Sequence, residues 1–173
     1  MRSFGITGAQ VSLPRRWARR HDTLLFYAKG KEWTLNADAV RVEYAEATKQ
    51  RFNHHVGNVR RSGADFGPQQ LNPKGKHPDD VWQISIVAPS AKARLGYPTQ
   101  KPEALLENVI LASSHEGDVV LDPFCGCGTT LTVAEQHRRN WLGIDISPTA
   151  IDICDRRLML VGASHSSEGA AQP

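Results

Sequence analysis

The sequence predicts an α/β fold built on a parallel sheet, and the order of elements in residues 117–147 carries this prediction. Residues 119–121 form a short apolar run that is typical of a buried parallel strand. A glycine-rich loop follows, then a helix over residues 129–137, then a second apolar strand over residues 141–146. A strand, a loop, a helix and a strand in this order indicate an α/β protein.

The loop between the first strand and the helix has the features of a nucleotide-binding turn. Asp122 ends the strand, and Gly126 and Gly128 allow tight backbone geometry and leave room for a ligand. The helix after the loop offers N–H groups and the positive end of its dipole. Asp145 ends the second strand, about 20 residues further on, where a carboxylate can accept hydrogen bonds from ribose hydroxyls.

The spacing of the glycines bears on which nucleotide binds. A dinucleotide fingerprint would place its third glycine at Leu131, so the loop does not match that pattern. A ligand with a ribose but no pyrophosphate fits better, which favours S-adenosylmethionine over NAD. An NAD-type domain remains the disfavoured alternative.

Composition limits the classes of protein. The 173 residues are 40% hydrophobic and carry a net charge of +3, which suits one ordinary domain or a little more. No stretch approaches eighteen apolar residues and no signal peptide is visible, so we expect no contact with a membrane. The first twenty residues contain several arginines and no acidic residue, and these arginines could bind phosphates: Arg2, Arg15, Arg16, Arg19 and Arg20.

The three cysteines, Cys125, Cys127 and Cys154, match neither a zinc pattern nor a disulfide framework. We interpret them as reduced thiols in a cytoplasmic protein, and we expect no bound metal. No neighbouring base marks Cys125 as a nucleophile.

Further elements follow from local patterns. Residues 22–29 are rich in β-forming side chains, and residues 80–87 alternate between apolar and polar side chains, so both segments are predicted strands. Residues 32–36 could continue the first strand. Residues 39–52 have helical potential. A helix beginning near Pro102 should bury an apolar stripe, and another should begin at Ser147 and Pro148 and run to about residue 161. The stripe of the first helix is Leu105, Leu106, Val109 and Ile110.

Residues 37–95 read as a loop-rich insert. Glycine, proline and scattered cations dominate its middle, and such segments inside a domain are functional or disordered. Its cations include Arg60, Arg61, Lys74 and Lys76.

Five strings together resemble the bacterial and phage DNA amino-methyltransferases, which methylate the exocyclic nitrogen of adenine or cytosine. The strings are HDTLLFYAKG at 21–30, HPDDVWQIS at 77–85, GYPTQKPEALLENVILAS at 96–113, DPFCGCGTT at 122–130 and WLGIDIS at 141–147. Their order is similar to the β class, in which the cofactor half follows the target-recognition region. The resemblance implies a partial Rossmann-like S-adenosylmethionine-dependent methyltransferase fold with a loop-rich target-recognition insert.

The resemblance also implies functions for residues. The TQKP turn would contact the methionine end of S-adenosylmethionine, the DPFxGxG loop would line its pocket, and the acid after the second strand would hold its ribose. The implied cofactor-binding residues are Thr99, Gln100, Lys101, Asp122, Phe124, Gly126, Gly128 and Asp145. Double-stranded DNA is the implied substrate, with Arg15, Arg16, Arg19, Arg20, Arg60, Arg61, Lys74 and Lys76 as candidate contacts.

The same reasoning divides the chain into four parts. Residues 1–36 would form a basic arm and a strand, residues 37–95 the target-recognition insert, and residues 96–162 the cofactor-binding half. Residues 163–173 are small and polar, which predicts a disordered tail.

The family's catalytic motif, [DNS]-P-P-[YFW], has no counterpart, since the sequence contains no pair of adjacent prolines. That motif grips the flipped base, and direct methyl transfer depends on alignment. We therefore assign no catalytic residue and expect the C-terminal part of an enzyme, with a separate chain as one possible source of the missing half. A non-catalytic DNA- or cofactor-binding protein and a fragment of an RNA methyltransferase are the alternatives.

Overall fold

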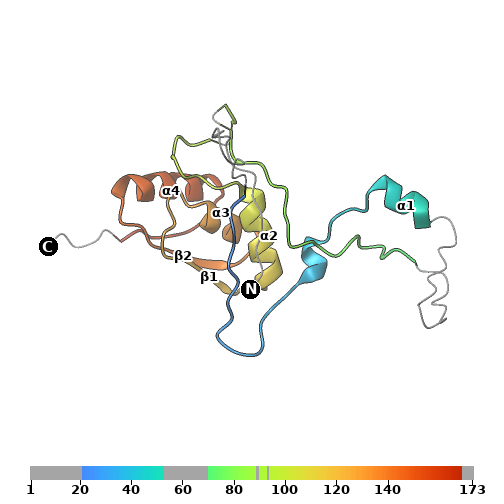
Figure 1. The fold of residues 1–173 in the computed structure, drawn as a ribbon. Coiled ribbons are helices and arrows are strands. Elements are labelled where there is room, and N and C mark those ends of the chain that lie inside the picture. The colour runs from blue at the N-terminus through green and yellow to red at the C-terminus, as the bar shows by residue number, and fades with distance from the viewer. Residues whose placement is uncertain (1–20, 53–69, 89, 93, 169–173) are drawn as a thin grey trace, which may run out of the picture. The chain divides into compact units, whose positions relative to one another are not determined.

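The structure, a computed structural model, describes residues 21–52, 70–88, 90–92 and 94–168. Its contacts divide the chain into two compact units. One unit spans residues 37–79, and the other is formed by residues before 37 and after 79. The elements in chain order are η1 Ala37–Val40, α1 Glu46–Phe52, α2 Glu103–Ser113, β1 Val119–Asp122, α3 Thr129–Gln136, β2 Asn140–Gly143 and α4 Pro148–Leu160 (Figure 1).

The two strands of the larger unit pair in parallel, which confirms the predicted strand, loop, helix and strand. Val120 lies opposite Trp141 in the register, and both pack against buried Val133 and Ala134 of α3. The connecting helix therefore covers the face of the sheet to which Val120 and Trp141 point. Leu131, Val133 and Ala134 of this helix are all buried.

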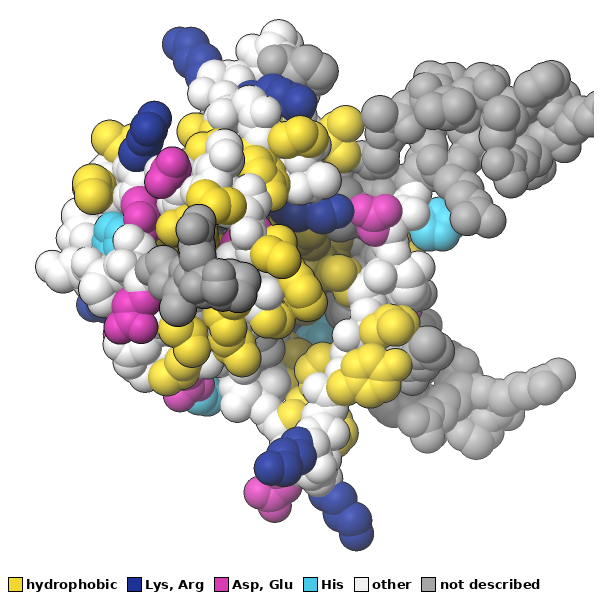
Figure 2. All heavy atoms as spheres, turned by 90° about the vertical axis from the view of Figure 1, so that its left-hand side faces the viewer, with side chains coloured by type: hydrophobic (Ala, Val, Ile, Leu, Met, Phe, Trp, Pro, Cys, Tyr) yellow, Lys and Arg dark blue, Asp and Glu magenta, His cyan; other side chains and the backbone are white. Residues whose placement is uncertain are grey.

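The opposite face of the sheet is open among the described residues. Val119, Leu121 and Leu142 are 70%, 57% and 55% exposed, and we call these three side chains the open sheet face. The prediction of a fully buried strand is therefore wrong for β1. Successive side chains of a strand point to opposite faces, and the helix packed on the strands covers only one of them. Hydrophobic side chains also gather widely on the face of the molecule that Figure 2 draws.

Helix α2 begins where its sequence predicts, and both of its ends have identifiable features. Pro102 is the N-cap residue and Glu103 lies in the first turn. At the other end the buried Arg139 donates from Nη2 to the carbonyl oxygen of Ser114 at 2.7 Å. Asn36 donates from Nδ2 to the same carbonyl at 2.8 Å. These donors satisfy the oxygen that a helix leaves unpaired at its C-terminus.

Helix α4 also follows its prediction. Ser147 caps it by accepting the N–H of Ala150 at 3.3 Å, and Cys154 and Leu158 are buried. After the helix, the ring of His165 lies 5.9 Å from that of Trp141. The disorder predicted for residues 163–173 stays a prediction, and residues 169–173 lie outside the described residues.

The predicted strands at residues 22–29 and 80–87 are wrong, since neither segment forms a strand, nor do residues 32–36, although Ser85 lies in an isolated β-bridge. Both segments have β-forming side chains, but a strand also needs a neighbour for its backbone hydrogen bonds. Among the described residues the sheet consists of β1 and β2 alone, and neither segment pairs with it.

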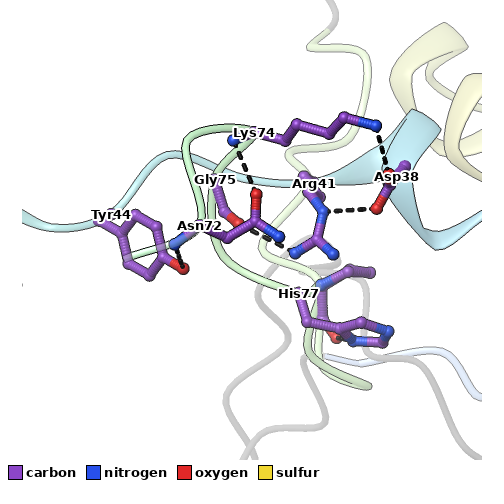
Figure 3. Close-up of polar contacts among 8 residues, drawn as sticks. Asp38, Arg41, Tyr44, Asn72, Lys74, Gly75 and His77 are labelled. Carbon is purple, nitrogen blue, oxygen red and sulfur yellow. Dashed lines mark hydrogen bonds and ion pairs between the residues drawn. The ribbon is translucent and has the colours of Figure 1, made fainter. Parts of the chain in front are cut away.

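The smaller unit is held largely by polar contacts around Asp38 (Figure 3). The Asp38 carboxylate accepts from Arg41 at 2.7 Å and from Lys74 at 2.6 Å. Arg41 also donates from Nη1 to the carbonyl of Gly75 at 2.9 Å, and Val42 forms an antiparallel bridge with Lys76. The helical potential predicted for residues 39–52 is realised only in part, as η1 and α1.

Candidate cofactor-binding site

The loop after β1 is held in place by hydrogen bonds that its backbone N–H groups donate. The N–H of Phe124 donates to Oδ1 of Asp122 at 3.1 Å, and the N–H of Cys125 donates to the carbonyl of Ile144 at 2.9 Å. Gly128 N–H closes the loop on the carbonyl of Cys125 at 2.8 Å. Each bond uses a donor near the carboxyl ends of the strands, so the loop has one defined shape there.

Asp145 joins this loop to the segment after β2. Its Oδ2 accepts the N–H of Gly126 at 2.8 Å, and its Oδ1 accepts the N–H of Ser147 at 2.9 Å. A carboxylate offers about four lone-pair sites, so each oxygen retains acceptor capacity beyond these bonds. The side chain is partly buried, and it can therefore hold the loop and still accept hydrogen bonds from a hydroxyl pair.

The two glycines of the loop are required by the protein's own packing. Both have positive φ, +52° at Gly126 and +72° at Gly128, a conformation that suits glycine. A Cβ on Gly128 would lie 2.3 Å from Sγ of Cys154, so the side chain of α4 fills the space at this glycine. The expectation that both glycines leave room for a ligand at the main chain stays a prediction, and at Gly128 the side that a Cβ would occupy is filled by Cys154.

Gly126 meets the second segment that the sequence singles out. A Cβ on Gly126 would lie 3.1 Å from Cε1 of Tyr97, so the tyrosine ring brings the residue 99–101 turn against the loop. Oε1 of Gln100 accepts the N–H of Leu95 at 2.9 Å and shapes that turn. The Lys101 ammonium pairs with Asp22 at 3.3 Å and stays largely exposed.

Helix α3 begins directly at the loop, at Thr129. Gly128 is its N-cap, and no side chain of the described residues makes a cap hydrogen bond there. The first turn of a helix has N–H groups without intrahelical partners and a partial positive charge. Phe124, which is 86% exposed, lies in the same loop. The structure thus brings together a carboxylate, a helix N-terminus and an exposed aromatic ring.

Two cysteines of this region, Cys125 and Cys154, have raised pKa values. Burial, assisted by the carboxylates of Asp122 and Asp145, raises the pKa of Cys125 to about 11. Burial also raises the pKa of Cys154 to about 12. A thiolate is the nucleophilic form of cysteine, so the structure agrees with the interpretation that Cys125 is no nucleophile.

Two residues near the site were not predicted from the sequence. Tyr97 precedes the residue 99–101 turn, and an aromatic ring beside a glycine-rich loop was the available signal. Arg157 lies on α4 and is buried. Its position, three residues after the buried Cys154, places it on the inner side of α4, whereas its neighbour Arg156 is exposed.

The candidate DNA contacts are only partly visible. Arg15, Arg16, Arg19, Arg20, Arg60 and Arg61 lie outside the described residues. Lys74 pairs with Asp38 at 2.6 Å, and Lys76 pairs with Asp79 at 2.5 Å. Both lysines remain substantially exposed, so each charge is partly balanced but accessible.

Within the described ranges, no group of three or more His, Cys, Asp or Glu side chains is arranged to hold a metal ion. The same residues include no helix long and apolar enough to cross a membrane.

Comparison with known proteins identifies the family. Residues 7–156 match a family model described as DNA methylase. The chain belongs to the DNA methylase family. This match covers most of the chain and confirms the resemblance to the bacterial DNA amino-methyltransferases.

Individual relatives of this chain are methyltransferases by name. The type II methyltransferase M.HpaI of Haemophilus parainfluenzae is 40% identical over 149 residues, which are 86% of this chain and 41% of the relative. The DNA adenine methyltransferase YhdJ of Escherichia coli (strain K12) is 36% identical over 166 residues, 95% of this chain and 52% of the relative. The chain thus spans about half the length of these two relatives.

One solved structure supports the fold. The M1.HpyAVI–SAM complex is similar with a TM-score of 0.58 and 23% identity, over 90% of this chain and 59% of that one. The likeness confirms the predicted partial Rossmann-like α/β fold for this DNA methylase.

Proposed function

We propose that this chain binds S-adenosylmethionine and double-stranded DNA for methyl transfer to an exocyclic amino group of adenine or cytosine. The proposed cofactor residues are those named from the sequence: Thr99, Gln100, Lys101, Asp122, Phe124, Gly126, Gly128 and Asp145. The observation that carries the proposal is the hydrogen bond from Gly126 to Asp145, which joins the loop to an acid with acceptor capacity left for a ribose.

The residues present fit the cofactor. Asp145 would accept hydrogen bonds from the ribose hydroxyls, and the exposed ring of Phe124 would cover a flat base. Lys101 supplies a cation for a carboxylate. Gly128, whose Cβ position is filled by Cys154, would contribute through its main chain. When bound, S-adenosylmethionine supplies an electrophilic methyl group on sulfur.

Support for DNA as the substrate comes from the family and from the relatives' names. We infer that residues 37–95 contribute to target recognition, with Lys74 and Lys76 near phosphates. Both lysines pair with carboxylates in exposed positions, where ion pairs are weak, so DNA phosphates can compete for them. A protein that acts on bacterial DNA would work in the cytoplasm.

The open sheet face suggests what the remainder of the enzyme does. A contiguous apolar surface on a strand pair needs a cover, and this chain spans only about half of its relatives. We infer that a segment equivalent to the unmatched part of those relatives covers Val119, Leu121 and Leu142. That segment would also supply the base-gripping motif, from the same polypeptide or from a separate chain.

Calorimetry and a transfer assay test the proposal together. The purified chain should bind S-adenosylmethionine, and the Asp145→Ala variant should not. Methyl transfer from labelled cofactor to unmethylated DNA should require the motif-bearing segment in addition. If the chain bound S-adenosylmethionine but transferred no methyl group either alone or with the motif-bearing segment, it would be a non-catalytic binding protein. If the chain did not bind the cofactor, the proposal would be refuted.

A further inference from the structure

The side chain of Arg157 lies buried where three segments meet: α4, the loop before α3, and the start of α2. Its side chain is only 8% exposed. Nη2 donates to Oε1 of Glu103 at 2.5 Å, and Nη1 donates to Oγ1 of Thr129 at 2.9 Å. Nη1 also lies 3.3 Å from the carbonyl oxygen of Cys127.

The guanidinium acts as a rigid link between these groups. Its two terminal nitrogens are held in one plane at a fixed separation, and each contacts a different segment. Glu103 begins α2, while Cys127 and Thr129 flank the N-cap of α3. The guanidinium is therefore a direct polar link between the start of α2 and the loop before α3.

The linked segments adjoin the two ends of the proposed cofactor pocket. Glu103 stands two positions after Lys101, at the end of the turn assigned to the methionine end. Cys127 belongs to the loop that Asp145 holds through Gly126, at the ribose end.

We propose that Arg157 is a positioning residue that sets the spacing between the residue 99–101 turn and the residue 122–128 loop. The proposal rests on the proposed function. It adds an explanation of how the two ends of the pocket are kept at a separation that matches the length of the ligand. Arg157 touches no ligand in this scheme; it acts through Glu103, Cys127 and Thr129.

A purely stabilising role for Arg157 predicts a different result. Removing one partner from a buried ion pair lowers stability whatever the ligand. A spacing role, in contrast, matters for a ligand that contacts both segments and much less for one that contacts a single segment. S-adenosylhomocysteine has both ends, whereas adenosine has only the nucleoside end.

The test compares both ligands by calorimetry on the full chain. Arg157→Met removes the link, Arg157→Lys keeps the charge but not the fork, and Glu103→Gln weakens one contact at a half-exposed position that folding tolerates. Arg156→Met, at the exposed neighbouring position, is the matched control. Circular dichroism at the working temperature verifies that each variant is folded.

We expect Arg157→Met to bind S-adenosylhomocysteine about tenfold or more weakly, the scale of one lost charged hydrogen bond. Adenosine affinity should change less than about twofold, and Arg156→Met should change neither. Arg157→Lys and Glu103→Gln should also weaken the binding of S-adenosylhomocysteine more than that of adenosine, by smaller factors. If Arg157→Met does not fold, these two variants test the positioning role. Equal losses for both ligands, or no loss for either, would overturn the positioning role alone. A wild-type chain that binds neither ligand would refute the proposed function, and this inference with it.

Discussion

The backbone N–H of Gly126 donates to the carboxylate of Asp145 at 2.8 Å. One hydrogen bond thus connects the loop after β1 to the segment after β2, residues far apart in the sequence. The same carboxylate accepts the N–H of Ser147 at the cap of α4. Asp145 therefore combines an internal bracing function with the ribose contact that we propose for it.

Replacing Asp145 with Asn tests this double function. An amide has a single acceptor oxygen, so its NH₂ group must face the N–H of either Gly126 or Ser147. We expect a loss of about 1–3 kcal/mol in the free energy of unfolding, together with weaker binding of S-adenosylhomocysteine. Urea titration and calorimetry measure the two effects.

Asp118→Asn is the matched control for that change. Asp118 accepts one backbone N–H, that of His115 at 2.8 Å, in an exposed turn. It should lose little stability and no ligand affinity. If Asp145→Asn bound the ligand as tightly as the wild-type chain, Asp145 would not be a ribose acceptor.

Replacing Gly128 with Ala should lower the free energy of unfolding by more than the positive φ alone accounts for. The new methyl group would lie 2.3 Å from Sγ of Cys154, at φ +72°. Gly117 has φ +85° with no atom within 4 Å of a Cβ, so Gly117→Ala reports the backbone cost alone, about 1–2 kcal/mol. Gly128→Ala should cost about 1–3 kcal/mol more from overpacking, as measured by urea unfolding.

A second substitution distinguishes the clash from other causes. Adding Cys154→Ala removes the sulfur and should restore part of the stability that Gly128→Ala loses. If the double variant were as unstable as the sum of the two single changes, the contact between Gly128 and Cys154 would not be the cause.

The helices of this chain were predictable because their signals are local. Pro102 with the apolar stripe of α2 located one helix, and Ser147 with Pro148 located the start of another. The pairing of residues 119–121 with 141–146 was also predictable, since a glycine loop and a short helix leave few other arrangements.

The errors concern properties that depend on distant neighbours. Residues 22–29 have side chains that suit a strand, but no described strand lies beside them to complete the hydrogen bonds. The packing of Cys154 against Gly128 could not be predicted, because the two residues meet only in the folded chain. Arg157 went unnoticed because its partners, Glu103 and Thr129, come together only in the folded chain.

The buried thiol of Cys125 predicts a dependence of stability on pH. Burial and the nearby carboxylates raise its pKa from 9.0 to about 11 in the folded chain. Because the folded pKa lies above the unfolded one, the contribution is fully present below about pH 9 and is lost as the pH rises toward about 11.

Cys125→Ser removes this titration, since serine does not titrate in that range. Unfolding free energies should differ by a constant amount from pH 7 to 8.5, and the wild type should then lose stability faster above about pH 9. Parallel curves across the whole range would contradict a raised pKa at Cys125.

The proposed contact between Lys74 and DNA predicts a change in salt dependence. A lysine that neutralises one phosphate contributes about one unit to the slope of log affinity against log salt. Lys74→Gln should therefore reduce that slope by about one for unmethylated duplex DNA, as measured by fluorescence anisotropy. Lys49→Gln is the control, because Lys49 pairs with Glu46 in the same unit and is similarly exposed. Equal slopes for Lys74→Gln and the wild-type chain would remove Lys74 from the DNA contacts.

The open sheet face predicts that one substitution separates folding from assembly. Leu142 is 55% exposed on β2, so Leu142→Glu should change the unfolding free energy of the chain by less than about 0.5 kcal/mol. It should nevertheless weaken association with the motif-bearing segment, because a charge would enter an apolar contact. Leu160→Glu, at an 85% exposed position on α4, should affect neither quantity. Urea unfolding and titration of the segment in calorimetry give the two values. A large loss of stability in the chain alone would mean that Leu142 is already covered, and the segment would then have to bind elsewhere.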